Sequence, residues 1–165
     1  MTSAAQGRGA APVVPRSPTL RHSDPPSTGL AECHPPAIVS LAVVAAHRTG
    51  QPLHAQLLAL GSCFDRVALT APVYRLIALP GPGVPRGGIV ATAVGGISVE
   101  VELHDLPVAA LGELLCALPS PLALGRVELL DGVVLGMVCS SAPPGSVDIS
   151  AHGSWLRYLA ASAVP

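Results

Sequence analysis

The sequence predicts an α+β domain, with a small mixed or antiparallel, barrel-like sheet and two or three helices. Short runs rich in Val, Ile and Leu recur along the chain and indicate strands. Turns that contain Gly or Pro separate most of these runs, as they do in hairpins. Only a few stretches space their leucines as a helix does. Strands that mostly follow one another, with helices inserted between them, favour the α+β class.

The first elements are a buried strand and a short helix. The run 38–46 is apolar and partly β-branched, which indicates a buried strand. A turn follows at 50–52, and its proline suits the first turn of a helix whose leucine stripe ends at Gly61. Two short strands are expected next, at 67–69 and 74–79.

The second half of the chain predicts two hairpins. A Gly-Gly pair joins the runs 89–93 and 97–103, and an Asp-Gly pair joins the runs 126–130 and 133–139. Both pairs are typical of two-residue turns, because glycine accepts the backbone angles that these turns need.

Two further helices are expected. Asp105-Leu106-Pro107 has the residue types of a helix start, and leucines at helical spacing follow it as far as Leu118. The stretch 148–162 closes the chain with a short helix that carries Trp155 and Tyr158.

The first 36 residues differ from the rest. Residues 1–36 contain seven prolines and few periodic apolar residues, so they predict a disordered, Pro-rich arm before a folded domain at 37–162. They also lack the apolar centre of a secretory signal, which predicts a cytoplasmic protein. A transit peptide remains the alternative, because Arg8, Arg16 and Arg21 occur among few acidic residues.

Composition excludes several classes of function. A net charge of −1 gives no reason to expect nucleic acid or an anionic membrane as partner. No uncharged apolar run approaches the ~18–20 residues that span a bilayer. The chain has no lysine, which excludes Schiff-base and Ser–Lys chemistry. The four cysteines are widely spaced, so we expect small buried side chains, with no metal site and no cofactor: Cys33, Cys63, Cys116 and Cys139.

The candidate chemistry begins where the first strand ends. His47 follows the apolar run and precedes a Gly/Pro turn, a place where small ligands commonly bind. It is interpreted either as a structural hydrogen-bonding residue or as an acid/base group, and His54 is near enough to face the same site. Arg48 and Arg75 either hold a carboxylate or form surface ion pairs.

A second polar group lies on the expected strand 97–103. Glu100, Glu102 and His104 alternate with apolar residues and therefore share one face. This face is interpreted either as the polar wall of a cavity or as the wet side of a half-buried strand.

Residues 37–161 resemble the C-terminal domain of allophanate hydrolase. The matching motifs occur in order along nearly the whole folded part, and together they are more specific than any one of them: Ala46-His47-x-x-Gly50-Gln51-Pro52-Leu53, Gln56-Leu57, Leu60-Gly61, Thr70-Ala71-Pro72, Tyr74-Arg75-Leu76, Ala78-Leu79-Pro80-Gly81, Val99-Glu100-Val101-Glu102, Leu106-Pro107, Pro119-x-Pro121-Leu122 and Gly153-x-Trp155-x-x-Tyr158-Leu159.

This resemblance implies a γ-glutamylcyclotransferase-like fold and a chemistry. In the full enzyme of that family, an amidase-type domain deaminates allophanate, and the C-terminal domain promotes decarboxylation of the resulting N-carboxycarbamate. Carried over to this chain, the resemblance implies that His47 is the acid/base group. The substrate-binding residues would be Gly50, Gln51, Pro52, Leu53, His54, Tyr74, Arg75, Glu100 and Glu102.

We therefore expect an enzyme that turns over a small carboxylated amide or carbamate, as a stand-alone version of this domain. Its partners would be a small-molecule substrate, a separate amidase protein and, in a homodimer, a second copy. A non-catalytic ligand-binding module that retains the fold is one alternative, and a γ-glutamylcyclotransferase-like enzyme is another. The chain departs from the family pattern at several positions, which motivates the first alternative: His54, Leu135, Met137, Ser140, His152 and Ser154.

Overall fold

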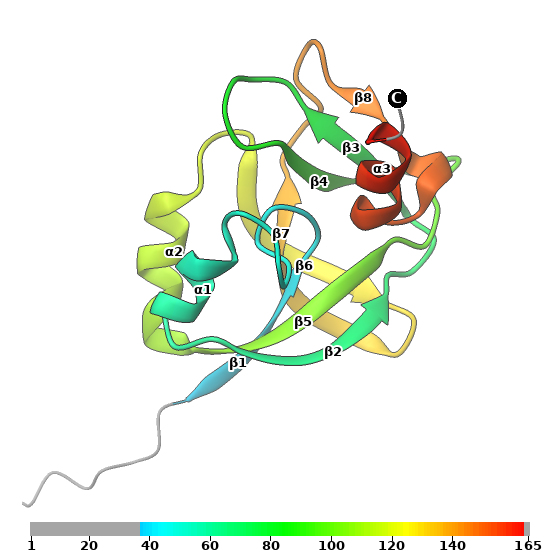
Figure 1. Ribbon diagram of the computed structural model, residues 1–165. Helices are drawn as coiled ribbons and strands as arrows, with labels where there is room; N and C mark the ends of the chain where they lie inside the picture. The colour runs from blue at the N-terminus through cyan, green and yellow to red at the C-terminus, as the bar shows by residue number, and fades with distance from the viewer. Residues whose placement is uncertain (1–36, 164–165) are drawn as a thin grey trace, which may run out of the picture. The chain divides into compact units, whose positions relative to one another are not determined.

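The computed structural model describes residues 37–163, and the predicted arm 1–36 lies outside them. Eight strands and three helices follow one another, with two 3-10 turns between them (Figure 1). In order they are β1 (Ile38–Val43), α1 (His54–Ala59), β2 (Cys63–Leu69), β3 (Tyr74–Leu79), β4 (Arg86–Ala91), β5 (Glu100–Pro107), η1 (Val108–Ala110), α2 (Leu111–Ala117), β6 (Leu122–Leu129), β7 (Gly132–Cys139), β8 (Val147–Asp148), η2 (Ser150–His152) and α3 (Trp155–Ser162).

The strands form one mixed, curled sheet in the shape of a half-barrel. Its order is β2-β5-β1-β7-β4-β3-β8, and β6 pairs with β7 beside this path. β1 lies between β5, which is antiparallel to it, and β7, which is parallel to it. This arrangement confirms the predicted α+β class. No helix within residues 37–163 is long and apolar enough to cross a membrane.

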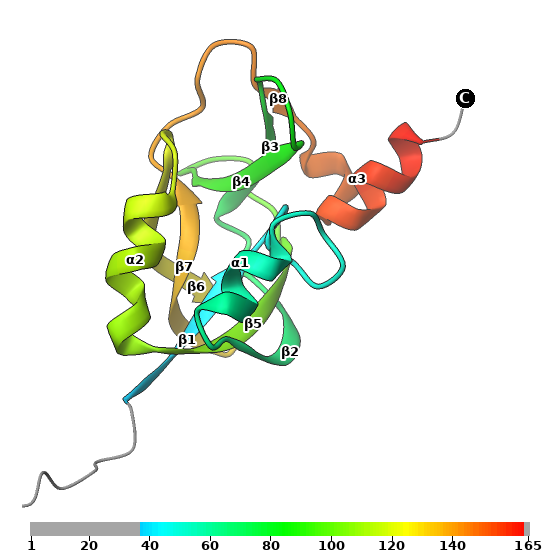
Figure 2. The same cartoon turned by 60° about the vertical axis from the view of Figure 1, so that its left-hand side comes forward.

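The sheet separates two apolar cores. β1 contributes to both, because Leu41 and Val43 face one side while Ala42 faces the other. The first side packs against α1 and α2, which lie next to each other in Figure 2, and the second side includes Trp155 of α3. Burial on both faces explains why the second half of this strand, Leu41 to Val43, is apolar at every position.

Gly136 of β7 lies where three strands come close together. A Cβ there would be 2.5 Å from Cγ2 of Val127 and 3.1 Å from the carbonyl oxygen of Ala42. We expect Gly136→Ala to lower the free energy of unfolding by about 1–3 kcal/mol through overpacking. Gly112→Ala in α2 is the control, because nothing lies within 4 Å of its Cβ position. Urea unfolding that showed equal stability for both variants would contradict this prediction.

The β6–β7 hairpin confirms the prediction from the Asp-Gly pair, although β6 begins four residues earlier than expected. The predicted Gly-Gly hairpin is wrong. β4 pairs with β3 and β7, whereas β5 pairs with β1 and β2. Gly96 instead allows two backbone segments to approach each other closely, since a Cβ there would be 2.6 Å from the carbonyl oxygen of Pro72.

Two further expectations need correction. The strand β5 continues through Pro107, and the helix begins only at Leu111, because Leu106 is fully buried in a ladder with β1. The cysteines are not all buried: Cys63 and Cys116 are exposed. Cys139 is buried, and its burial raises the pKa of its thiol to about 11.

Candidate active site

The chain leaves β1 through a compact loop, residues 44–53, which we call the histidine loop. Its backbone closes on itself: the N–H of Arg48 donates to Ala45 O at 2.9 Å, and the N–H of Leu53 donates to Ala46 O at 2.8 Å. Gly50 has φ +76°, a conformation that favours glycine. The loop therefore has a fixed shape before it enters α1.

His47 lies on this loop with only 6% of its surface exposed. Its Nε2 is 3.2 Å from Oε1 of Gln56 on α1, and the amide oxygen accepts a hydrogen bond from the ring N–H. Burial lowers the pKa of His47 below its ordinary value, although the hydrogen bond to Gln56 acts in the opposite direction. The free ring is therefore neutral at pH 7, and its second nitrogen can accept a proton.

A small cavity lies beside this ring. His47 and Leu53 line it from the loop, Arg86 from the start of β4, and Leu122 and Met137 from β6 and β7. The volume open to the centre of a water molecule is about 10 Å³, which is room for about one water. Arg86 is the only cationic side chain among the described residues that line it, and it is partly exposed.

Gly87 forms part of the same wall. A Cβ at this position would be 2.6 Å from the ring of Trp155, the first residue of α3, and 3.0 Å from Ile77 O. The absent side chain therefore leaves the space that this indole ring occupies. Trp155 itself is 1% exposed.

Behind the loop lies a buried charged cluster. Arg48 is 2% exposed and binds two carboxylates of β5: its Nη2 is 2.8 Å from Oε1 of Glu100, and its Nε is 3.2 Å from Oε1 of Glu102. The hydroxyl of Ser154 also donates to Glu100, at 3.1 Å. The arginine is thus neutralised by the protein itself.

The second oxygen of Glu102 holds further groups. The backbone N–H of Thr49 donates to it at 2.7 Å, and Nε2 of His104 donates to it at 3.3 Å. Nδ1 of His104 lies 3.1 Å from the hydroxyl of Ser62, within hydrogen-bond distance. Both His104 and Ser62 are buried, so this chain of contacts links β5 to the start of β2.

The carboxyl groups of this cluster have lowered pKa values. Burial alone would raise the pKa of Glu102, but the N–H of Thr49, the hydrogen bond from His104 and the charge of Arg48 lower it below its ordinary value. Burial also opposes ionisation of Glu100, and its hydrogen bond and charge interaction with Arg48 outweigh that effect and lower its pKa.

These shifts predict two losses of stability on acidification. The unfolded state takes up a proton at His47 below about pH 6.5, while the folded ring does so only at lower pH, so the free energy of unfolding falls. Below about pH 4.5 the unfolded carboxyls of Glu100 and Glu102 are protonated first, and stability falls again. Urea unfolding between pH 7.5 and 3.5 measures both losses. A His47→Gln variant should lack the loss that begins near pH 6.5. If that loss persisted in the variant, its assignment to His47 would be wrong.

The structure brings together only some of the predicted site residues. His47 and Leu53 line the cavity, while Gly50 and Pro52 are exposed and Gln51 is partly exposed at the turn. The ring of His54 packs edge-on against that of His104, with centroids 5.7 Å apart. None of the three turn residues lines the cavity.

The remaining predicted residues lie elsewhere. Glu100 and Glu102 bind Arg48, and their side of β5 is buried, so the interpretation as a wet strand face is wrong for Glu102 and His104. Tyr74 is buried, and its hydroxyl accepts the backbone N–H of Glu128 at 2.9 Å. Arg75 is half-exposed, and its Nη1 lies 3.7 Å from Oδ2 of Asp148.

Sequence reasoning missed Arg86. It stands at the end of a Pro/Gly loop, and no local pattern marks it. The pairing of β4 with β7, and of β7 with β1, brings it to the histidine loop.

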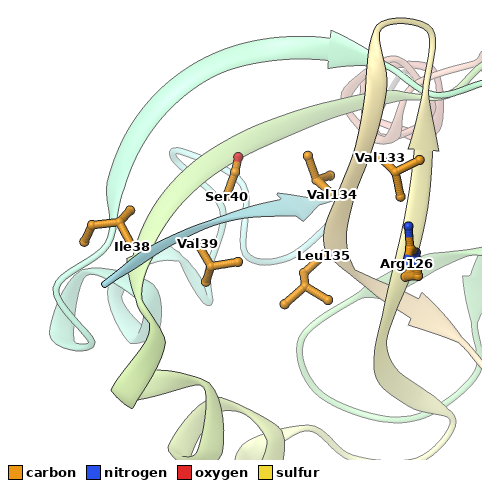
Figure 3. A pocket seen from close by; sticks show the side chains of 7 residues that line it. All are labelled: Ile38, Val39, Ser40, Arg126, Val133, Val134 and Leu135. Atoms are coloured by element: carbon orange, nitrogen blue, oxygen red, sulfur yellow. The ribbon is translucent and has the colours of Figure 1, made fainter. Parts of the chain in front are cut away.

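A more open groove of about 430 Å³ lies between the first residues of β1 and the β6–β7 hairpin (Figure 3). Apolar side chains such as Ile38, Val133 and Leu135 dominate it, with Arg126 at one side. None of the titratable groups described above lines it. The smaller cavity beside His47 is therefore the better candidate for chemistry.

The half-barrel belongs to a known class of fold. An AIG2-like protein (GGACT) from Mus musculus superposes with a TM-score of 0.52 at 17% identity, covering 65% of this chain and 80% of that one. This likeness concerns the fold alone. It confirms the predicted γ-glutamylcyclotransferase-like architecture.

The chain belongs to the allophanate hydrolase C-terminal domain family, whose model matches residues 39–160. Urea amidolyase of Saccharomyces cerevisiae is 32% identical over 131 residues, which are 76% of this chain and 7% of that protein. Among solved structures, Kluyveromyces lactis allophanate hydrolase has a TM-score of 0.72 at 32% identity, covering 75% of this chain and 21% of that one. The chain thus spans a small part of these relatives.

A shorter relative matches over nearly its whole length. The uropathogenic E. coli-specific protein c4763 is 31% identical with a TM-score of 0.70, and the match covers 75% of this chain and 97% of that one. The domain therefore occurs both inside long chains and as nearly the whole of a short one.

Proposed function

We propose that this domain promotes the decarboxylation of a small carboxylated amide or carbamate, such as N-carboxycarbamate, with His47 as the acid/base group. The observation that carries the proposal is the placement of a buried, neutral imidazole beside Arg86 at one cavity. The family relationship supports it as well.

The chemistry follows from these two side chains. Arg86 binds a carboxylate of the substrate through charge-assisted hydrogen bonds. The bound anion raises the pKa of His47, so the ring takes up a proton. As the N–C bond breaks, its electron pair goes to nitrogen, the imidazolium gives that nitrogen its proton, and carbon dioxide leaves.

The size of the cavity adds a condition. It holds about one water molecule, so a substrate of several heavy atoms enters only if the wall moves. Arg86 is the side chain suited to this, because it is long and partly exposed at the first position of β4. Outward movement of its guanidinium would admit the substrate, and its return would place the charge on the carboxylate.

The test supplies the substrate as it forms, from a separate amidase protein that deaminates allophanate. The release of carbon dioxide is followed with and without the purified chain. We expect faster release with it, and equal rates would contradict the proposal and leave the ligand-binding role.

A γ-glutamylcyclotransferase activity is the second candidate that the fold suggests. No carboxylate lines the cavity among residues 37–163, since Glu100 and Glu102 are bound to Arg48. Among these residues, the cavity therefore offers no carboxylate that could act as a general base beside His47, which weighs against this second activity. Formation of 5-oxoproline from γ-glutamyl amines by the purified chain would overturn this ranking.

A further inference from the structure

We infer that Glu102 is a positioning residue, which fixes the histidine loop from behind and so holds His47 against its cavity. Its effect on catalysis rests on the proposed function, whereas its effect on the loop does not. The inference stands on the contacts of one carboxylate and on those of its neighbour Glu100.

Glu102 accepts hydrogen bonds from the two residues that follow His47. Its Oε1 accepts from Nε of Arg48 at 3.2 Å, and its Oε2 accepts from the backbone N–H of Thr49 at 2.7 Å. The side chain is 7% exposed, so water competes little for these bonds. A carboxylate that receives a loop N–H restrains the backbone itself, not merely a side chain.

Glu102 itself lies on a strand that is held on both sides. β5 is an inner strand, paired with β1 on one side and β2 on the other. His104 lies two residues further along β5 and donates to the same oxygen, at 3.3 Å, while Ser62 holds its other nitrogen. The carboxylate is therefore held in place by a buried histidine and by both flanking strands.

Glu100 provides an internal comparison. It lies on the same face of β5, and it also binds Arg48, at 2.8 Å. Its other partners are Ser154 and Arg157, at 3.1 and 3.7 Å, and no backbone N–H of the histidine loop donates to it among the described contacts. The two glutamates thus share a charge and a partner, and they differ in the contact with the loop backbone.

A glutamine at position 102 keeps the shape but cannot keep the contacts. An amide offers one accepting oxygen and one donating NH₂ group, whereas the carboxylate accepts from three donors. If its oxygen serves Arg48, the N–H of Thr49 faces another donor; if its oxygen serves Thr49 and His104, its NH₂ group faces Nε of Arg48. Either orientation removes one of the two contacts between Glu102 and the histidine loop.

The experiment compares Glu102→Gln with Glu100→Gln by NMR titration of the His47 ring, assigned through a His47→Gln variant. In Glu102→Gln we expect the pKa of His47 to rise towards its ordinary value of about 6.5, because a released loop lets water reach the ring. The loss of a nearby negative charge would by itself lower that pKa, so only loosening gives a rise. In Glu100→Gln, which keeps the contact with the loop backbone, the pKa should not rise. An unchanged or lowered pKa in Glu102→Gln, or the same rise in both variants, would overturn the inference.

The coupled assay for carbon dioxide separates this inference from the proposed function. A raised pKa of His47 in Glu102→Gln, without any effect of the chain on carbon dioxide release, would keep the positioning role and reject the reaction. If Glu102→Gln does not fold, amide exchange in the wild-type chain decides. The Thr49 amide should then exchange far more slowly than that of exposed Gly50, and comparable rates would overturn the inference.

Discussion

Replacing Arg48 by methionine is expected to lower the free energy of unfolding by about 3–5 kcal/mol, the usual cost of removing one partner of a buried ion pair. Arg48 is 2% exposed and lies between Glu100 and Glu102. Without it, the buried carboxylate of Glu102 and the partly exposed carboxylate of Glu100 no longer share a cation. Urea unfolding at pH 7 measures the loss.

The control is Arg75→Met, which removes the same group from a half-exposed pair whose charged atoms are 3.7 Å apart. Such pairs contribute about 0–1 kcal/mol. The loss in Arg48→Met should also shrink towards pH 4, because the two carboxyls then take up protons and no longer repel each other. Similar losses in the two variants at pH 7 would show that the cluster does not depend on its arginine.

Replacing His47 by alanine is expected to slow the chain's contribution to carbon dioxide release by about 10²–10⁴-fold, the usual value of a positioned acid or base. We expect the variant to remain folded, because the ring makes one hydrogen bond to a side chain, that of Gln56, among the described residues. The coupled amidase assay measures the rate, and circular dichroism confirms that the variant is folded.

His152→Ala is the matched control for this prediction. Its imidazole packs against Tyr158, with ring centroids 5.5 Å apart, and does not line the cavity. We expect this variant to release carbon dioxide at the wild-type rate. A His47→Ala variant that is folded and as active as His152→Ala would remove His47 from the reaction.

Local pattern was enough for part of the fold. The apolar run of β1 and the Asp-Gly pair of the β6–β7 hairpin identified their elements, because burial on both faces and a tight turn each leave a distinct mark in sequence. The Gly-Gly pair at 95–96 misled because glycine serves two purposes. It permits a tight turn, and it also permits close approach of two backbones, as at Gly96.

The candidate site was predictable to a smaller extent. Alternation placed Glu102 and His104 on one face of a strand, but it does not report whether that face meets water. Glu102 contacts Arg48, which lies 54 residues earlier in the chain, and His104 packs against the rings of His54 and Phe64. Arg86 reaches His47 only through the order of strands β4, β7 and β1, and that order is set by contacts far apart in sequence.

Gly87 lies between the last helix of residues 37–163 and the cavity beside His47. One surface of this residue belongs to the wall beside His47, and the other supports the indole of Trp155. A tilt of α3 would therefore press on, or release, the floor beneath any bound molecule. If the cavity holds the proposed substrate, a substitution in α3 would therefore change which molecule fits there, with every wall residue left unaltered.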